Sequence, residues 1–225
     1  MEKDMDLCFI YADLPFWRAE VSRITLHIGG VAFEDRRVQS ADFQKAKETG
    51  QLKDGTILPF HQIPCLLVDG VPIAQTAGIA RFCGKLAGLY PTDDDLKAAQ
   101  IDQFVDLATD LNVMVSKTSS IEDLAEKVAA RKELAQGLLA RKLSMLERCI
   151  QEGSDWIVGP KITIADIAIW RLLGWLSSGI LDGIPTHILK GFPNIRRVCL
   201  AVDTHPKVRE WVAMKYPENY NRGQY

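Results

Sequence analysis

The sequence has no excess of basic residues and no long apolar run. Lysine and arginine number 27 against 29 aspartate and glutamate, which gives a net charge of −2. A nucleic-acid-binding protein typically shows a basic excess or patch, so the composition does not favour that class. No apolar run approaches the length of a membrane span. The first residues, MEKDMDL, lack the apolar core of a signal peptide. We expect a cytoplasmic globular protein with neither a nucleic-acid nor a membrane partner.

Cysteine is scarce, odd in number and widely spaced. The sequence has five cysteines and no C-x-x-C motif, and its Cys and His residues show no spacing typical of a metal site. This pattern predicts small buried hydrophobic side chains in a reducing compartment and no metal. The five are Cys8, Cys65, Cys83, Cys149 and Cys199.

At 225 residues the chain is long for one domain and comfortable for two small ones. Its first part alternates apolar runs with helical spacing and then shows a hairpin, which predicts the order βαβ-α-ββα and a mixed sheet. The expected elements are strands at 7–11 and 31–36, helices at 16–28 and 41–49, and the hairpin and helix that follow.

The segment PFHQIPCLLVDGVPIAQTAGI, residues 59–79, is the most informative part of the sequence. Pro64 stands where a strand begins, and Asp69-Gly70 is a strong hairpin signal. Gln75-Thr76 opens a helix, whose free N–H groups and positive dipole end suit a carboxylate. A cis Ile63-Pro64 bond would expose the Ile63 backbone for strand-like pairing with a peptide ligand. The pattern alone favours an ordinary hairpin followed by a capped, packed helix.

The second part reads as entirely helical. Leu89-Tyr90-Pro91 predicts a boundary, and the acidic cluster at 92–95 suits the first turn of a new helix. Apolar residues then recur at helical spacing over 101–115 and over a long stretch, 121–150. Thr163 and Asp166 predict a capping box, and Pro193 and Pro206 mark two further helix starts.

The motifs PF-x-x-IP, L-x-VDG and AQ-[ST]-x-x-I together resemble the glutathione-binding segment of cytosolic glutathione transferases. The sequence is most similar to the sigma class and its mu, alpha and pi relatives, from about Leu7 to about Tyr216. The resemblance implies an α/β thioredoxin-like domain that binds glutathione, residues 1–88, and an all-α helical domain that supplies the electrophile pocket, residues 89–225. It implies a homodimer that conjugates reduced glutathione, a cosubstrate, to hydrophobic electrophiles without a further cofactor.

The resemblance also implies a catalytic tyrosine. Tyr11 matches that residue of the family, and Arg18-Ala19-Glu20 matches the motif that follows it, with one extra residue in between. Arg18 is expected to hold the loop or the thiolate. A thiol-transferase variant would have cysteine where Leu14 stands, and the loop contains no serine. The tyrosine mechanism is the one that remains.

Eight positions match the family's glutathione-binding residues. Gln75 and Thr76 correspond to the pair that binds the γ-glutamyl end, and Ile63, before Pro64, to the residue whose backbone pairs with the cysteinyl part. Phe43, Lys47 and Gln62 align with residues near the glycine carboxylate. Asp110 matches an acidic residue that reaches the ligand's amine from the other subunit. Without the resemblance, Lys47, Gln62 and Asp110 would read as ordinary surface residues.

A non-catalytic descendant of the same fold is the alternative: a lens-crystallin-like structural protein, or a ligand-carrying or scaffold module. Lens-type relatives often lengthen the region between the first two helices of the second domain, and residues 117–120 show no such insertion. The sequence does not name the electrophile. Lipid hydroperoxides and prostaglandin isomerisation stay open beside conjugation.

Overall fold

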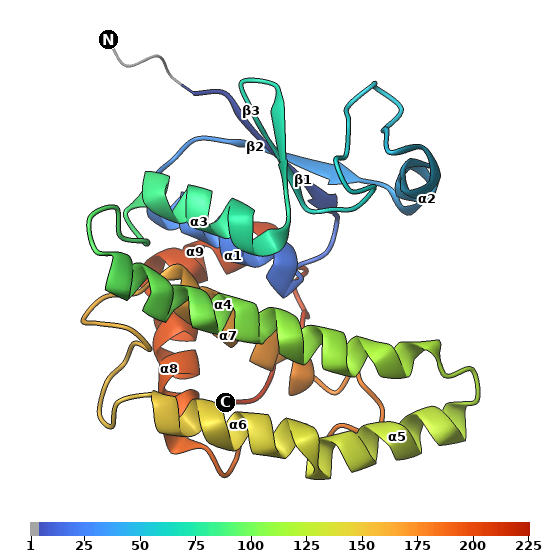
Figure 1. The fold of residues 1–225 in the computed structure, drawn as a ribbon. Coiled ribbons are helices and arrows are strands. Elements are labelled where there is room, and N and C mark those ends of the chain that lie inside the picture. The colour runs from blue at the N-terminus through green and yellow to red at the C-terminus, as the bar shows by residue number, and fades with distance from the viewer. Residues whose placement is uncertain (1–4) are drawn as a thin grey trace. The chain divides into compact units, whose positions relative to one another are not determined.

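Four strands form one mixed sheet in the first of the two units into which the chain divides, Met1–Pro91 and Thr92–Tyr225 (Figure 1). The computed structural model describes residues 5–225. The sheet order is β2-β1-β3-β4, with β1 parallel to β2 and antiparallel to β3. The strands are β1 (Leu7–Ala12), β2 (Glu34–Val38), β3 (Cys65–Val68) and β4 (Val71–Ala74). The predicted mixed sheet is confirmed.

Three helices complete the first unit: α1 (Trp17–Ile28), α2 (Ser40–Thr49) and α3 (Thr76–Ala87). Helices α1 and α3 lie side by side against one face of the sheet, where Phe9, Tyr11 and Leu66 join their apolar residues in one core (Figure 1). The two helices approach closely because Gly29 has no side chain: a Cβ there would lie 2.5 Å from the Cα of Ala87. Together these elements form a thioredoxin-like unit.

Strand β2 begins three residues later than its predicted start at Val31. The Val31 N–H donates to the Leu26 carbonyl at 3.0 Å, so this residue still belongs to the turn that follows α1. Val31 and Phe33 are apolar because they pack against the core on the α1–α3 face, before the strand starts.

The predicted hairpin and the predicted cis Ile63-Pro64 bond are both present. Asp69 and Gly70, with φ of 50° and 81°, form the two-residue connection between β3 and β4. Positive φ at both positions is what a tight hairpin turn that follows the strand twist requires. The Asp69 carboxylate also accepts a hydrogen bond from the Asp6 N–H at 3.0 Å.

The second unit contains only helices among its described residues, as predicted. They are α4 (Asp95–Ser116), η1 (Lys117–Ser120), α5 (Leu124–Gln136), α6 (Leu138–Cys149), α7 (Ile164–Leu176), α8 (Pro193–Thr204) and α9 (Pro206–Lys215). The stretch 121–150 is divided at Gly137, whose φ of −102° and ψ of −106° lie far from helical values. The predicted proline starts of α8 and α9 are confirmed.

Helix α7 is the buried centre of the second unit, and its capping box is confirmed. The Asp166 carboxylate accepts hydrogen bonds from the Thr163 N–H at 2.7 Å, the Thr163 hydroxyl at 2.9 Å and the Ile157 N–H at 2.7 Å. A single carboxylate therefore fixes the start of the helix and also the segment that precedes it.

Four of the five cysteines are buried, and all five have free thiols. Cys149, the last residue of α6, is exposed, so the expectation of five buried cysteines is wrong at this position. Among residues 5–225, no helix is long and apolar enough to cross a membrane.

Candidate functional site

Tyr11 lies near the end of β1, beside the loop that precedes β3. Ile10 pairs with Cys65, which brings Tyr11 next to Pro64. The ring is only 8% exposed, and its hydroxyl makes no hydrogen bond within the described residues. Burial raises the pKa of Tyr11 to about 12, against the opposing effect of Arg18 and Arg23. The phenol is therefore protonated at neutral pH and can donate a hydrogen bond.

Arg18 connects the start of α1 with the start of α3. Its Nη1 donates to the Thr76 hydroxyl at 3.4 Å, and its guanidinium lies 5.1 Å from the ring of the buried Trp17. Burial lowers the pKa of Arg18, while the neighbouring Tyr11 raises it. Two of the predicted groups, the tyrosine loop and the γ-glutamyl pair, thus meet through this side chain.

The α3 N-terminus presents Gln75 and Thr76. Gln75 is exposed and has a φ of 74°, a backbone conformation that non-glycine residues rarely adopt. Its carbonyl accepts the Ile79 N–H at 3.0 Å, while the first N–H groups of the helix have no partner within the helix. Such an N-terminus is suited to binding an anion.

His61 links the loop that holds Gln62 to α2, which carries Phe43 and Lys47. The His61 Nδ1 lies 3.1 Å from the Lys47 carbonyl, which places the loop holding Gln62 against the end of α2. The Lys47 ammonium stands 4.9 Å from the centre of the Phe43 ring.

Ile63, the next residue of the loop, packs against the cores on both faces of the sheet. Neither its N–H nor its carbonyl is hydrogen-bonded within the described residues. The Ile63 backbone can therefore pair with a ligand without breaking an existing hydrogen bond.

Asp110, the remaining predicted residue, lies exposed on α4 in the second unit. Sequence reasoning missed Arg23, which lies fully buried on α1 with its guanidinium 5.9 Å from the centre of the Tyr11 ring. The available signal was its spacing of three residues from Glu20, which places the two on one face of a helix.

The buried thiols of the first unit are poor nucleophiles. Burial raises the pKa of Cys65 to about 11 and that of Cys83 to about 12, and burial together with a hydrogen bond to Glu34 raises that of Cys8 to about 12. All three are protonated at neutral pH, whereas the thiolate is the reactive form.

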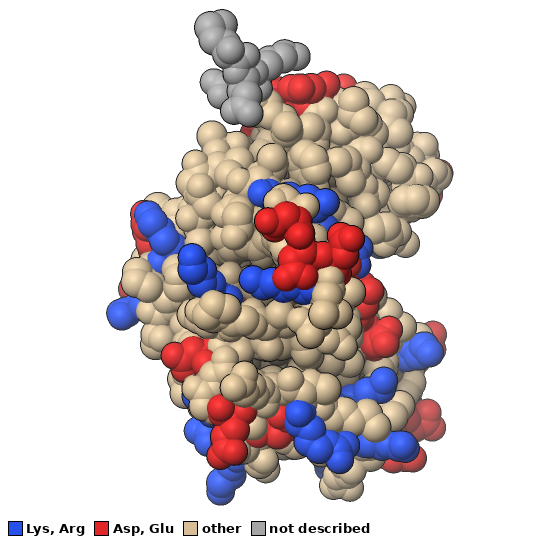
Figure 2. Space-filling model, turned by 60° about the vertical axis from the view of Figure 1, so that its left-hand side comes forward, with Lys and Arg blue, Asp and Glu red and all other residues tan. Residues whose placement is uncertain are grey.

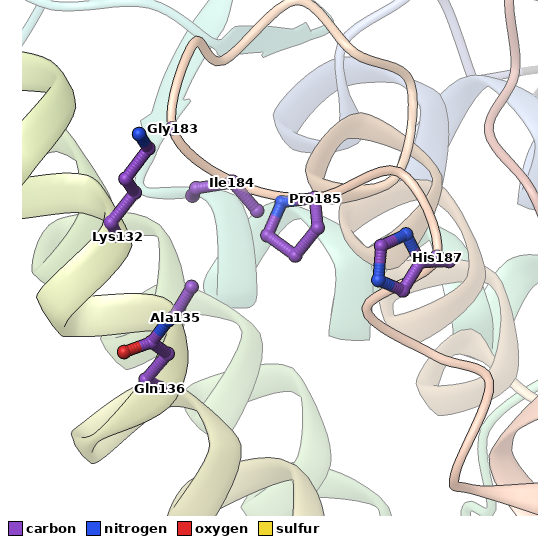
Figure 3. A pocket seen from close by; sticks show the side chains of 7 residues that line it. All are labelled: Lys132, Ala135, Gln136, Gly183, Ile184, Pro185 and His187. Carbon is purple, nitrogen blue, oxygen red and sulfur yellow. The ribbon is translucent and has the colours of Figure 1, made fainter.

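A hollow of about 560 Å³ lies in the second unit between α5 and the segment before α8 (Figure 3). It is lined by Lys132, Ala135, Gln136, Gly183, Ile184, Pro185 and His187. None of the predicted site residues belongs to it.

On the face shown in Figure 2, basic and acidic side chains are interspersed. The described residues contain no group of three or more potential metal ligands.

Comparisons with known proteins bear on both units. Residues 109–215 match the model of the glutathione S-transferase C-terminal domain. Glutathione S-transferase 1 of Ascaris suum is 30% identical over 198 residues, which cover 86% of this chain and 89% of that protein. The hematopoietic prostaglandin D synthase of Gallus gallus is 27% identical over 195 residues, 87% of this chain and 89% of that protein.

A solved structure of prostaglandin synthase D from Nilaparvata lugens superposes with a TM-score of 0.79. The superposition covers 94% of this chain and 98% of the chain from Nilaparvata lugens. Because the two sequences are 24% identical, it supports the fold alone. The Ascaris relative is similar enough, in identity and in coverage, to show the family as well as the fold. The motifs around Pro64 and Gln75 agree with it. The chain belongs to the cytosolic glutathione transferase family, among its sigma-like members.

Proposed function

We propose that the protein conjugates reduced glutathione to hydrophobic electrophilic small molecules, with Tyr11 stabilising the thiolate. The observation that carries the proposal is the convergence, in one unit, of Tyr11, Arg18, Thr76 and the unpaired backbone of Ile63. The first unit would bind glutathione, and the helical unit would bind the electrophile.

The chemical step is nucleophilic attack by the glutathione sulfur. The thiol releases its proton to solvent, and the thiolate forms the carbon–sulfur bond as the electrophile loses its leaving group or accepts the electron pair. A free thiol has a pKa of about 8.5 and is mostly protonated at neutral pH. A hydrogen bond from Tyr11 to the charged sulfur lowers that pKa, because it favours the thiolate over the thiol.

Glutathione binding follows from the chemistry of the surrounding groups. The α3 N-terminus with Gln75 and Thr76 suits the γ-glutamyl carboxylate, and the Ile63 backbone suits pairing with the cysteinyl residue. Lys47 offers a cation to the glycine carboxylate, with Phe43 beside it and Gln62 on the loop that His61 joins to the Lys47 backbone. Within the described residues, Thr76 is the member of this assignment whose side chain already has a hydrogen bond, which it accepts from Arg18, and its hydroxyl can still donate to the ligand.

Thr76→Val is expected to weaken glutathione binding by about tenfold, because it removes a hydroxyl that can bond the ligand's charged carboxylate, a contact of about 1.5 kcal/mol. Valine keeps the shape of the side chain. Isothermal titration calorimetry with reduced glutathione gives the affinity, and Thr49→Val, at the exposed end of α2, is the matched control. Equal affinities in both variants would remove Thr76 from the site.

The activity itself is tested by turnover of chlorinated dinitrobenzene with glutathione, alongside retention on immobilised glutathione. Retention and turnover together support the proposed enzyme. Retention without turnover of this and other electrophiles identifies a non-catalytic, ligand-binding descendant. Failure in both measurements refutes the glutathione site.

The protein is also expected to form a two-fold homodimer in which each site borders Asp110 of the other copy. Phe60 and Ile57, on the loop before β3, are 59% and 53% exposed, an apolar surface that an interface would cover. Light scattering at micromolar concentration should give twice the monomer mass. A fully active monomer would contradict this expectation.

Asp110→Ala should weaken glutathione binding several-fold and leave the dimer intact, because it removes a charge partner of the ligand's amine. The control is Asp106→Ala, which lies one turn earlier on α4. A similar loss in both variants would point to a general charge effect.

A further inference from the structure

Arg23 is a fully buried cation at the centre of an ion-pair cluster in the first unit. Its Nε donates to the Asp35 carboxylate at 2.8 Å and its Nη1 to the Glu20 carboxylate at 3.1 Å. Glu20 is itself buried, while Asp35 is 11% exposed. Burying charges is costly unless they are paired and hydrogen-bonded, so such a cluster needs its full set of partners.

The cluster reaches the segment that joins Tyr11 to α1. The Arg23 Nη1 also lies 3.4 Å from the Leu14 carbonyl, which it can reach as a donor. Asp35 is shared with Arg37, whose guanidinium binds Asp13. Two consecutive residues of the segment 12–16 are therefore held by arginines that meet at one carboxylate.

The same guanidinium lies against the tyrosine ring. Its carbon is 5.9 Å from the centre of the Tyr11 ring and 5.5 Å from that of Phe9. Its remaining nitrogen, Nη2, is buried and has no hydrogen-bond partner within the described residues. Arg23 thus lies against the Tyr11 ring while it also holds the segment that follows Tyr11.

We propose that Arg23 is a positioning residue that fixes Tyr11 and the segment 12–16 for thiolate stabilisation. The inference rests on the proposed function. By the motif comparison this segment carries one extra residue, and two of its residues, Asp13 and Leu14, are held by Arg37 and Arg23. The planar guanidinium of arginine can hold this segment because it donates to Asp35, Glu20 and Leu14 at the same time, whereas the ammonium of lysine is a compact point charge.

Arg23→Lys is expected to lower kcat about tenfold at neutral pH with little change in glutathione affinity, because Gln75, Thr76 and Ile63 are untouched. The pKa of bound glutathione, followed by thiolate absorbance, should rise toward its value in Tyr11→Phe. In the Tyr11→Phe background the same substitution should have no further effect, since it acts through Tyr11. Arg36→Lys is the matched control, because Arg36 pairs with Glu34 and Asp54 and its strand neighbour Ile10 faces the opposite core.

A second measurement does not depend on glutathione. Fluorotyrosine incorporated into the protein gives a fluorine resonance for Tyr11, assigned with Tyr11→Phe. Arg23→Lys should shift this resonance, and Arg36→Lys should leave it in place. If wild type shows no turnover but the resonance shifts, the proposed function fails while the positioning role survives. An unshifted resonance, or additive losses of kcat in the double variant, would overturn the role of Arg23.

Discussion

Tyr11→Phe is expected to bind glutathione as wild type does and to lose most of its turnover at neutral pH. The substitution removes only the hydroxyl, which makes no hydrogen bond to the described residues, so the fold should be unaffected. A hydrogen bond to a charged acceptor contributes about 1.5–3 kcal/mol, which corresponds to roughly one to two units of thiol pKa. We therefore expect a loss of about ten- to a hundredfold in kcat/KM.

The pH dependence identifies the cause of that loss. The hydroxyl lowers the pKa of the bound thiol, so the fold-difference in thiolate between the two proteins is full below the lowered pKa, shrinks as pH rises above it and disappears above the ordinary value of about 8.5. The pKa of Tyr11 is about 12, so the donor stays protonated throughout this range. Activity of Tyr11→Phe should thus recover as pH rises, whereas the control Tyr90→Phe follows wild type. A profile identical to wild type in Tyr11→Phe would assign catalysis to another group of the loop.

Asp166→Ala should be the most destabilising single substitution considered for the second unit. The buried carboxylate accepts three hydrogen bonds, from Ile157 and from two groups of Thr163. Alanine leaves these buried donors unpaired, and each unpaired donor costs about 1–3 kcal/mol. A loss of about 3–5 kcal/mol in the free energy of unfolding is expected from urea denaturation followed by circular dichroism.

Asp166→Asn tests the effect of the carboxylate charge by itself, because asparagine has nearly the same shape as aspartate but does not titrate. Burial raises the pKa of Asp166 to about 6, above its ordinary value of about 3.9, despite the three hydrogen bonds. The folded state therefore binds the proton more tightly, and wild type gains stability from this group as pH falls from about 6 to about 4. The asparagine variant lacks that gain, so the free energy of unfolding of wild type should rise relative to that of Asp166→Asn as pH falls over this range. A constant difference between the two would show that Asp166 titrates normally.

Local signals were sufficient for much of the fold. The Asp69-Gly70 turn, the Thr163 capping box and the helix starts at Pro193 and Pro206 all depend on interactions within a few residues, so the sequence reveals them. The mixed sheet followed from element order, because a crossover and a hairpin permit few arrangements.

Features that depend on packing were not predictable in the same way. Val31 and Phe33 are apolar because they pack against a core, although they lie outside β2. Gly137 separates two helices whose apolar residues looked like one continuous helical pattern. The spacing of Arg23 from Glu20 was visible in the sequence, but its pairing with Asp35 was not, because Asp35 comes from a strand whose register only the folded sheet fixes. The candidate residues Tyr11, Arg18 and Thr76 came from resemblance to a family, and only the structure shows that the last two touch.

Trp17 gives the first unit an optical label of its own. The sequence has five tryptophans, and the other four, Trp156, Trp170, Trp175 and Trp211, all belong to the second unit. The indole of Trp17 is buried against the guanidinium of Arg18, which in turn contacts Thr76. In a protein whose other tryptophans are replaced by phenylalanine, the wavelength and intensity of Trp17 fluorescence would report changes in the surroundings of Arg18 without an attached dye. The same protein would report the melting of one unit separately from that of its neighbour in the chain.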